Sequence, residues 1–383
     1  MDSTFQAACE VALARWDVPA AVIGMLVDER RSTVSVGCDS TTRFRIASIT
    51  KPFTALAACR RLDLGSQVGV WPETTVSDLL SHLSGSECEL GDLTRFGTGD
   101  DALERLAAAL PSAGRVVPPR TIWSYANTGY WLTGALLGRA AGRSYEEEIL
   151  GLIAEIGLEA TDFGEPDLPG TGADVLAGGY PRARRPSGGL VSTADEIVAF
   201  GEWLLQSDEL ALMARPLGRP VAGVYGLGLF GERVAGTPVW GHSGSVDGFQ
   251  AMLLVVPERG AVFAGLTNAS NGRQALREIE DAWLELAVGA RRAVRETVAL
   301  DDGALAAFAG RYANDSVLAT VVVGEPGLRV ALAYNGAEPV DVEARPIGPA
   351  TFEIVDGPFR RDRFDFPAPG LARFGSRLAN RVA

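Results

Sequence analysis

The hydrophobic pattern divides the chain into a part with mixed helical and strand periodicities and a C-terminal part with strand patterns alone. Apolar residues recur at helical spacing over residues 3–16 and again over 274–290, which predicts an amphipathic helix at each place. Runs rich in branched and aromatic residues predict strands. These strands are expected over residues 20–28, 32–37, 225–230, 237–244, 248–258 and 261–268.

The segment between these two groups of strands is mainly helical in pattern. Helices are expected from Ser48 to about residue 63, near 101–110, within 121–142 and within 186–205, where Ser192 or Thr193 is the expected N-cap. Residues 86–120 and 161–185 are rich in Gly and Pro and predict long loops. We therefore predict an α+β fold, with an antiparallel sheet flanked by helices plus a helical subdomain. The terminal helices are expected to pack on one face of the sheet.

The composition shifts near residues 291–302, and short strand-like segments separated by turn residues follow. This pattern predicts a small all-β barrel. The sequence thus predicts two domains, 1–295 and 301–383. The barrel strands are expected over residues 308–312, 319–323, 328–334, 351–355 and 363–367.

Composition narrows the classes of partner. The formal net charge of −13 argues against nucleic acid or an anionic membrane. No apolar run approaches the ~20 residues of a membrane span, and the N-terminus has no basic region of a signal peptide. Four cysteines without metal-site spacing and only two histidines argue against a metal centre. We expect a soluble, cytoplasmic protein with reduced thiols, no metal and no cofactor.

The chain contains one lysine, Lys51, and every other basic residue among its 35 Lys and Arg is arginine. Arginine is effectively always protonated, whereas a desolvated lysine can lose its proton near neutral pH. A site that needs a titratable amine cannot use arginine in its place. Alternatively, the lone lysine lies on a solvated helix face and has no chemical role.

Ser48 lies three residues before Lys51, at the expected start of a helix, where serine is also a preferred cap. Residues three apart share one helix face, so the two side chains are expected to meet. A neutral Lys51 can take the hydroxyl proton and leave an alkoxide at the positive end of the helix. Serine and lysine also meet at this spacing by chance, and a capping serine needs no chemistry.

Two further segments add candidate groups. A hydroxyl of Tyr125 near Lys51 could relay a proton to a leaving group, and Asn127 could hold Lys51 and a substrate carbonyl. The segment Gly241–Gly244 places His242 between glycines in a predicted strand, where glycine often marks close approach of a ligand. Alternatively, Tyr125 and His242 are buried structural residues.

Together, S-x-x-K, Y-x-N and H-S-G, in this order, resemble the serine β-lactamase and penicillin-binding-protein superfamily. The nearest branch is the class C β-lactamase type, with its esterase, D-aminopeptidase and transacylase relatives. The resemblance covers roughly Phe5 to Val288, and the unit after residue 301 is similar to a lipocalin-like domain, beginning with F-x-G-x-Y at Phe308–Tyr312. The supporting segments are FRIASITK, LLSHLSG, WSYANTGY, SGGLVSTADE, YGLG and GHSGSVDGF.

The resemblance implies a role for each motif residue. Ser48 is the expected nucleophile, Lys51 its general base, and Tyr125 the proton relay that also activates the second nucleophile. Asn127 is expected to bind substrate and orient Lys51. The backbone N–H groups of Ser48 and Ser245 form the expected oxyanion hole. His242 is an expected catalytic residue, in the place of the third motif's cation, and Ser243 and Gly244 are expected to bind substrate. His82 falls in a motif that the resemblance implies is structural.

The third motif departs from many relatives, because His242 stands where they carry lysine, and histidine is mostly neutral at pH 7. This departure weakens the case for a dedicated β-lactamase. We expect an acyl-serine enzyme that hydrolyses an ester, amide or related acyl compound. The alternative is a transacylase or peptide cyclase in antibiotic-type biosynthesis that passes the acyl group to an amine. A third alternative is an inactive binding protein of this fold. The expected partners are a small-molecule acyl substrate and an amine acceptor.

Overall fold

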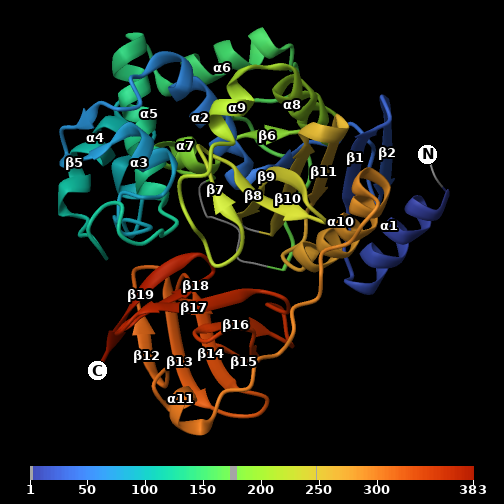
Figure 1. Ribbon diagram of the computed structural model, residues 1–383. Helices are drawn as coiled ribbons and strands as arrows, with labels where there is room; N and C mark the ends of the chain where they lie inside the picture. The colour runs from blue at the N-terminus through green and yellow to red at the C-terminus, as the bar shows by residue number, and fades with distance from the viewer. Residues whose placement is uncertain (1–2, 173–178, 247) are drawn as a thin grey trace.

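The computed structural model describes residues 3–172, 179–246 and 248–383, and its larger part is built on a seven-stranded antiparallel sheet (Figure 1). The strand order β2-β1-β11-β10-β9-β8-β7 pairs the first strands of the chain with the last strand of this sheet, so that Ala21 lies opposite Thr267. The strands are β1 (Ala21–Val27), β2 (Arg30–Val36), β7 (Val224–Tyr225), β8 (Phe230–Val234), β9 (Thr237–Val246), β10 (Phe249–Val256) and β11 (Ala261–Thr267).

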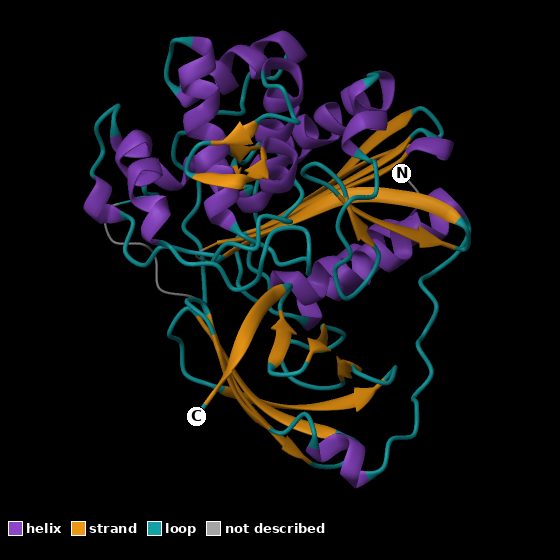
Figure 2. Cartoon of the chain, turned by 60° about the vertical axis from the view of Figure 1, so that its left-hand side comes forward, coloured by secondary structure: helices purple, strands orange, loops and turns teal. Residues whose placement is uncertain are grey.

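Helices cover both faces of the sheet, as Figure 2 shows. The terminal helices α1 (Ser3–Arg15) and α10 (Gly272–Val288) pack together on one face with a shared apolar core, which confirms the predicted arrangement. On the other face α8 (Ala194–Gln206) lies so close to the sheet that a Cβ on Gly201 would stand 2.5 Å from a methyl group of Val262. The N-cap of α8 is Thr193, one of the two predicted candidates.

A helical subdomain is inserted between β2 and β7. Two short strand pairs accompany it, β3 (Phe44–Arg45) with β6 (Val191–Ser192), and β4 (Gln67–Val68) with β5 (Trp71–Thr75). Its long central helix, α5, contacts α2, α3, α4, α6 and α7. The helices are α2 (Thr50–Arg61), α3 (Val76–Leu80), α4 (Ala102–Ala109), α5 (Asn127–Ala141), α6 (Tyr145–Ile156), α7 (Arg185–Gly188) and α9 (Glu209–Met213).

A closed eight-stranded antiparallel barrel follows residues 290–301, which form no helix or strand, and the short helix α11 (Asp302–Ala306). Buried aromatic side chains, among them Phe352, Phe364 and Phe374, occupy its interior. The predicted fold class is confirmed, whereas the boundaries 1–295 and 301–383 stay predictions. The barrel strands are β12 (Gly310–Ala313), β13 (Val317–Val323), β14 (Leu328–Tyr334), β15 (Val340–Pro346), β16 (Thr351–Ile354), β17 (Arg363–Ala368), β18 (Leu371–Phe374) and β19 (Arg377–Val382).

Some predicted elements were wrong. Residues 225–230 are not one strand, because the chain turns between β7 and β8, and Gly228 has a left-handed φ of +78°. The sequence also gave no indication of β15, β18 and β19. Residues 173–178 of the predicted loop 161–185, and Asp247 of the GHSGSVDGF segment, lie outside the described residues.

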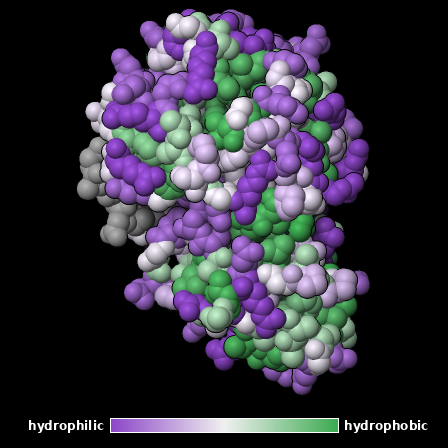
Figure 3. Space-filling model, turned by 90° about the vertical axis from the view of Figure 1, so that its left-hand side faces the viewer, coloured by the Kyte–Doolittle hydropathy of each residue, from purple (hydrophilic) through white to green (hydrophobic). Residues whose placement is uncertain are grey.

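The barrel contacts the larger part of the molecule at several places. One is the outer side of α10, where Arg273 and Arg277 pair with Asp362, and Arg361 pairs with Asp281 at 2.7 Å. Another is the turn between β12 and β13, where Asp315 accepts the backbone N–H of Glu89. A further contact is the turn between β18 and β19, which meets residues 123–125. Figure 3 shows the barrel as the smaller lower lobe, with polar and apolar residues intermingled on this face. Among the described residues, no helix has the length and apolar character needed to cross a bilayer.

Candidate active site

Ser48 lies in a short 3-10 turn, η1 (Ala47–Ile49), that runs directly into α2. The residue before it, Ala47, has a left-handed φ of +47°, a conformation that non-glycine residues rarely adopt and that is often found at functional sites. The N-cap position of α2 is Ile49 and makes no side-chain bond. The capping role considered for Ser48 is therefore wrong, and its hydroxyl is free to face other side chains.

Lys51 is fully buried one helical turn further on. Its Nζ lies 3.0 Å from the hydroxyl of Ser48 and donates to the carbonyl of Ser187 at 2.6 Å. The rings of Tyr125 and Tyr130 lie below the amine, with centroids 4.9 and 5.3 Å away. The structure thus brings Ser48 and Lys51 together as the three-residue spacing predicted, and it excludes the alternative of a solvated lysine.

Burial sets the protonation of this amine. Desolvation lowers the pKa of Lys51 well below its usual value, and the guanidinium groups of Arg184 and Arg377 lower it further. The carboxylate of Glu89 and the thiol of Cys88 oppose this shift in the pKa. Full burial is the largest of these influences, so the net shift of the pKa is downward. A neutral Lys51 has a lone pair that can accept the hydroxyl proton of Ser48.

Tyr125 approaches the same hydroxyl from the segment before α5. Its phenol donates to the Oγ of Ser48 at 3.0 Å, and its side chain is almost completely buried. Burial raises the pKa of Tyr125 above its usual value, although the bond to Ser48 counteracts part of this change. The phenol is therefore protonated at neutral pH and can give its proton to a leaving group.

Asn127, the first residue of α5, is turned differently from the expected orientation. Its amide Nδ2 donates to the carboxylate of Glu89, while its Oδ1 has no hydrogen-bond partner. The expectation that Asn127 orients Lys51 is wrong for this structure, because Glu89 holds the Nδ2 end of the amide and Oδ1, the atom that could accept from the amine, makes no hydrogen bond. The carbonyl of Ser187 takes that place on Lys51 instead.

The third motif lies on β9. It follows Gly241, which is the last residue of β9 that pairs with β8. The free edge contacts η1, and a Cβ on Gly244 would stand 2.3 Å from the carbonyl oxygen of Ile46. The glycine in this strand predicted the close approach of a ligand. At Gly244, the group that approaches closely is instead the backbone beside Ser48. Ser243 and Ser245 are exposed on this edge, and the Oγ of Ser245 accepts from Gln250 at 2.9 Å.

His242 is buried beside the aromatic rings of Tyr125 and Phe230. Burial, aided by the nearby Lys51, lowers the pKa of His242 to about 3. Its Nε2 lies 3.2 Å from the hydroxyl of Tyr225. His242 is therefore neutral at physiological pH and does not supply the cation that lysine gives at this place.

His82 lies behind the site, in contact with several aromatic residues. Its ring centroid is 4.2 Å from that of Tyr125, and its Nδ1 accepts the backbone N–H of Ala126 at 3.1 Å. Desolvation lowers the pKa of His82 well below its usual value, so the ring stays neutral. This environment fits the structural role implied by the resemblance.

Three residues that the sequence did not indicate lie around these groups: Cys88, Glu89 and Arg377. The Nε of Arg377, at the start of β19, donates to the Sγ of Cys88 at 3.0 Å, and its guanidinium lies 5.7 Å from the centre of the Tyr125 ring. Cys88 and Glu89 come from the irregular segment 86–120, which has no periodicity to mark them. Arg377 comes from a barrel strand that was not predicted.

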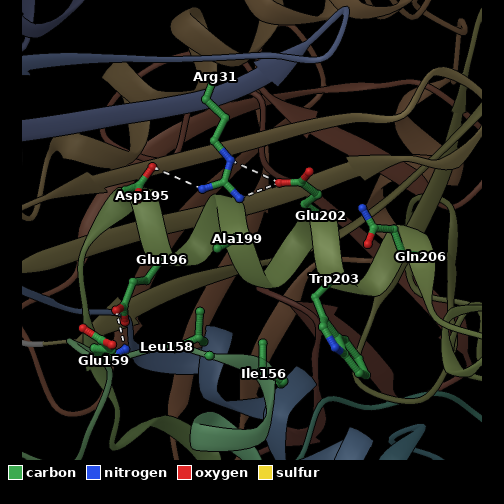
Figure 4. A pocket seen from close by; sticks show the side chains of 11 residues that line it. Arg31, Ile156, Leu158, Glu159, Asp195, Glu196, Ala199, Glu202, Trp203 and Gln206 are labelled. Carbon is green, nitrogen blue, oxygen red and sulfur yellow. Dashed lines mark hydrogen bonds and ion pairs between the residues drawn. The ribbon is translucent and has the colours of Figure 1, made fainter.

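A separate shallow cavity of about 470 Å³ lies between β2, α6 and α8 (Figure 4). Arg31 reaches across it toward α8, where it pairs with Asp195 and Glu202. The carboxylate of Glu196 accepts the backbone N–H groups of residues 159 and 160. Arg31, Asp195, Glu196 and Glu202 of this cavity are thus bound to one another or to backbone, so we assign no chemistry to it.

Comparison with known proteins identifies the family. The Beta-lactamase family model matches residues 10–287. Penicillin-binding protein 4 of Amycolatopsis lactamdurans is 28% identical over 322 residues, which cover 66% of this chain and 81% of that protein. A D-aminopeptidase of Cereibacter sphaeroides is 26% identical over 245 residues, covering 55% of this chain but only 47% of that protein. The crystal structure of SurE with D-Leu covers 99% of both chains, with a TM-score of 0.77 at 22% identity.

The fold and this family match define a serine acyl hydrolase or acyl transferase. The chain belongs to the beta-lactamase family, in the broad sense that includes penicillin-binding proteins and D-aminopeptidases.

Proposed function

We propose that the protein cleaves amides of amino acids or short peptides through an acyl-Ser48 intermediate. The observation that carries this proposal is the hydroxyl of Ser48, which lies 3.0 Å from both the Lys51 amine and the Tyr125 phenol. The buried amine accepts a proton and the phenol donates one. A nucleophile with a base and an acid at hydrogen-bond distance is what acyl transfer requires.

In the acylation step, Lys51 takes the proton of Ser48 while Oγ attacks the substrate carbonyl. The backbone N–H groups of Ser48 and Ser245 are proposed to hold the resulting oxyanion; one such donor typically contributes about 10²–10³ in rate. As the C–N bond breaks, Tyr125 gives its proton to the departing amine and recovers one from Lys51. Water then attacks the ester by the reverse proton path, which releases the acid and restores Ser48.

Charged groups around the nucleophile favour an amino-acid-derived substrate. The carboxylate of Glu89 fits a substrate ammonium group, and the guanidinium of Arg377 fits a carboxylate. Both residues contribute to the electrostatic environment of Lys51 and Tyr125. The D-aminopeptidase relative supports amide substrates, while the neutral His242 argues against a dedicated β-lactamase.

Aminolysis is a second candidate, favoured by the position of the barrel. Arg377, at the start of β19, lies over the ring of Tyr125, with its guanidinium 5.7 Å from the ring centre. Glu89 could then hold the ammonium group of an acceptor amine. In this case the acyl group of Ser48 passes to an amine rather than to water, as in a transacylase or a peptide cyclase.

A substrate panel separates the two candidates. We expect wild-type protein to release p-nitroaniline from D-alanine p-nitroanilide and to hydrolyse D-leucine amide, and Ser48→Ala to do neither, while the exposed Ser112→Ala control retains activity. Mass spectrometry of the products, with and without added D-leucine, gives the fate of the acyl group. Free acid alone supports hydrolysis, and a D-leucine conjugate supports transfer. Equal turnover by Ser48→Ala would overturn both.

A further inference from the structure

The segment that carries Tyr125 has neither helix nor strand from residue 121 to 126, so it lacks the hydrogen bonds of regular structure. The barrel supplies several of them. The backbone N–H of Tyr125 donates to the carbonyl of Ser376 at 2.9 Å, and the N–H of Leu378 donates to the Oγ of Ser124 at 3.1 Å. Two consecutive residues of the site segment are thus bound by the β18–β19 hairpin.

A third bond comes from Arg373, on β18, whose side chain is 6% exposed. Its Nη1 donates to the carbonyls of Trp123 and Arg219 at 2.9 and 3.0 Å. The same guanidinium binds both oxygens of Asp365, at 2.9 and 2.6 Å. Its planar set of five N–H donors lets one side chain join a barrel strand to two segments of the larger unit.

We infer that Arg373 and the β18–β19 hairpin form a clamp that positions Tyr125 against Ser48, and that the barrel is therefore part of the active site. This inference rests on the proposed function, in which Tyr125 protonates the leaving amine. Arg373 is a positioning residue, because its hydrogen bonds go to backbone carbonyls and Asp365 rather than to the reacting atoms.

The physical reason is that Tyr125 is held from two sides. From the larger unit, the carbonyl of His82 accepts the N–H of Ser124 at 3.2 Å, and the ring of His82 accepts the N–H of Ala126. From the barrel, the hairpin holds residues 123–125. Removal of one side leaves an irregular segment free to shift, and a displacement of ~1 Å can cost on the order of 10²-fold in rate.

The contact between the barrel and α10 provides a matched control. Arg277 on α10 binds Asp362 and the carbonyl of Arg360, and neither partner lies on the β18–β19 hairpin or on residues 121–126. Arg277→Gln therefore weakens the attachment of the barrel without removing a bond to the Tyr125 segment. Arg373→Gln weakens the attachment at the site itself.

Two substrates with different leaving groups test the clamp. Cleavage of p-nitrophenyl acetate releases p-nitrophenolate, which needs no proton to leave. Cleavage of D-alanine p-nitroanilide releases an amine, which must be protonated as it leaves. We expect Arg373→Gln to lower kcat for the anilide by ~10–100-fold with KM retained, and to lower the rate of the initial p-nitrophenolate burst, which reports acylation by the ester alone, less than about threefold. Tyr125→Phe should show the same selectivity more strongly, and Arg277→Gln should change neither substrate.

Hydrogen–deuterium exchange provides a readout that does not depend on a substrate. The peptide spanning residues 121–126 should exchange faster in Arg373→Gln than in wild type, and at the wild-type rate in Arg277→Gln. If Arg373→Gln does not fold, Ser124→Ala replaces it, because this change removes the bond to Leu378 alone.

The outcomes separate the clamp from the proposed function. Unchanged exchange in both variants, or equal loss on both substrates in Arg373→Gln, overturns the clamp even if Tyr125→Phe is selective and the proposed function stands. A Tyr125→Phe protein without selectivity overturns the proton-donor role of Tyr125 and the clamp that depends on it. Absence of anilide turnover in wild type counts against amide hydrolysis, and the exchange result then decides whether the hairpin holds the segment.

Discussion

Lys51→Arg is expected to lower turnover on the order of 10³–10⁴-fold, as much as Lys51→Ala does. Arginine keeps a positive charge but cannot lose its proton in a protein. The buried amine of Lys51 lies 3.0 Å from Ser48, and burial lowers its pKa, so its function here is to accept a proton. Steady-state kinetics with p-nitrophenyl acetate, alongside circular dichroism to verify folding, measures the effect.

The control is the reverse substitution, arginine to lysine, at another position of the same helix. Arg60 is partly exposed on α2 and pairs with Glu155 and Glu209. Arg60→Lys keeps that charge and should leave turnover unchanged. A folded Lys51→Arg protein that retains wild-type turnover would contradict the role of Lys51 as a base.

Lys51→Met is expected to change how stability depends on pH. In the unfolded chain the amine is protonated below about pH 10.4, whereas in the folded protein burial lowers its pKa well below that value. The unfolded state then binds one more proton, so the free energy of unfolding of the wild type contains a contribution that rises with pH up to about 10. Methionine has no such proton, and this contribution is absent from the variant.

We therefore expect the stability of Lys51→Met relative to wild type to be greatest at pH 7 and to fall by about 1.4 kcal/mol per pH unit up to pH 9. Loss of the hydrogen bonds to Ser48 and Ser187 changes the stability difference between variant and wild type by the same amount at each pH. It does not change how that difference varies with pH. Urea unfolding of both proteins at pH 7, 8 and 9 measures it. A difference that does not vary with pH would mean that the folded protein keeps Lys51 protonated.

Local patterns made part of this structure predictable. The contact between Ser48 and Lys51 follows from the three-residue spacing at a helix start, which fixes the two side chains on one face. The seven-stranded sheet follows largely from runs of apolar residues, except at β7 and β8, where glycines allow a turn that periodicity does not reveal. The contact between Tyr125 and Ser48 cannot be predicted from local spacing, because 77 positions separate the two residues in sequence. It was expected only from the order of the motifs.

The remaining features depend on contacts distant in sequence. Strands β18 and β19 contain Arg373, Arg377 and Arg381, which interrupt the apolar alternation of a typical barrel strand. Arg373 is nevertheless buried, because Asp365 and carbonyls of the larger unit satisfy its donors. The orientation of Asn127 likewise depends on Glu89, 38 positions earlier, in a segment without periodicity. No local pattern contains this information.

Intact-protein mass spectrometry after reaction with a fluorophosphonate tests the acyl-Ser48 account most directly. The account predicts a single adduct on wild-type protein, located at Ser48 by peptide mapping, and none on Ser48→Ala. An adduct of equal yield on folded Ser48→Ala, or one mapped to another residue of the wild type, would contradict it.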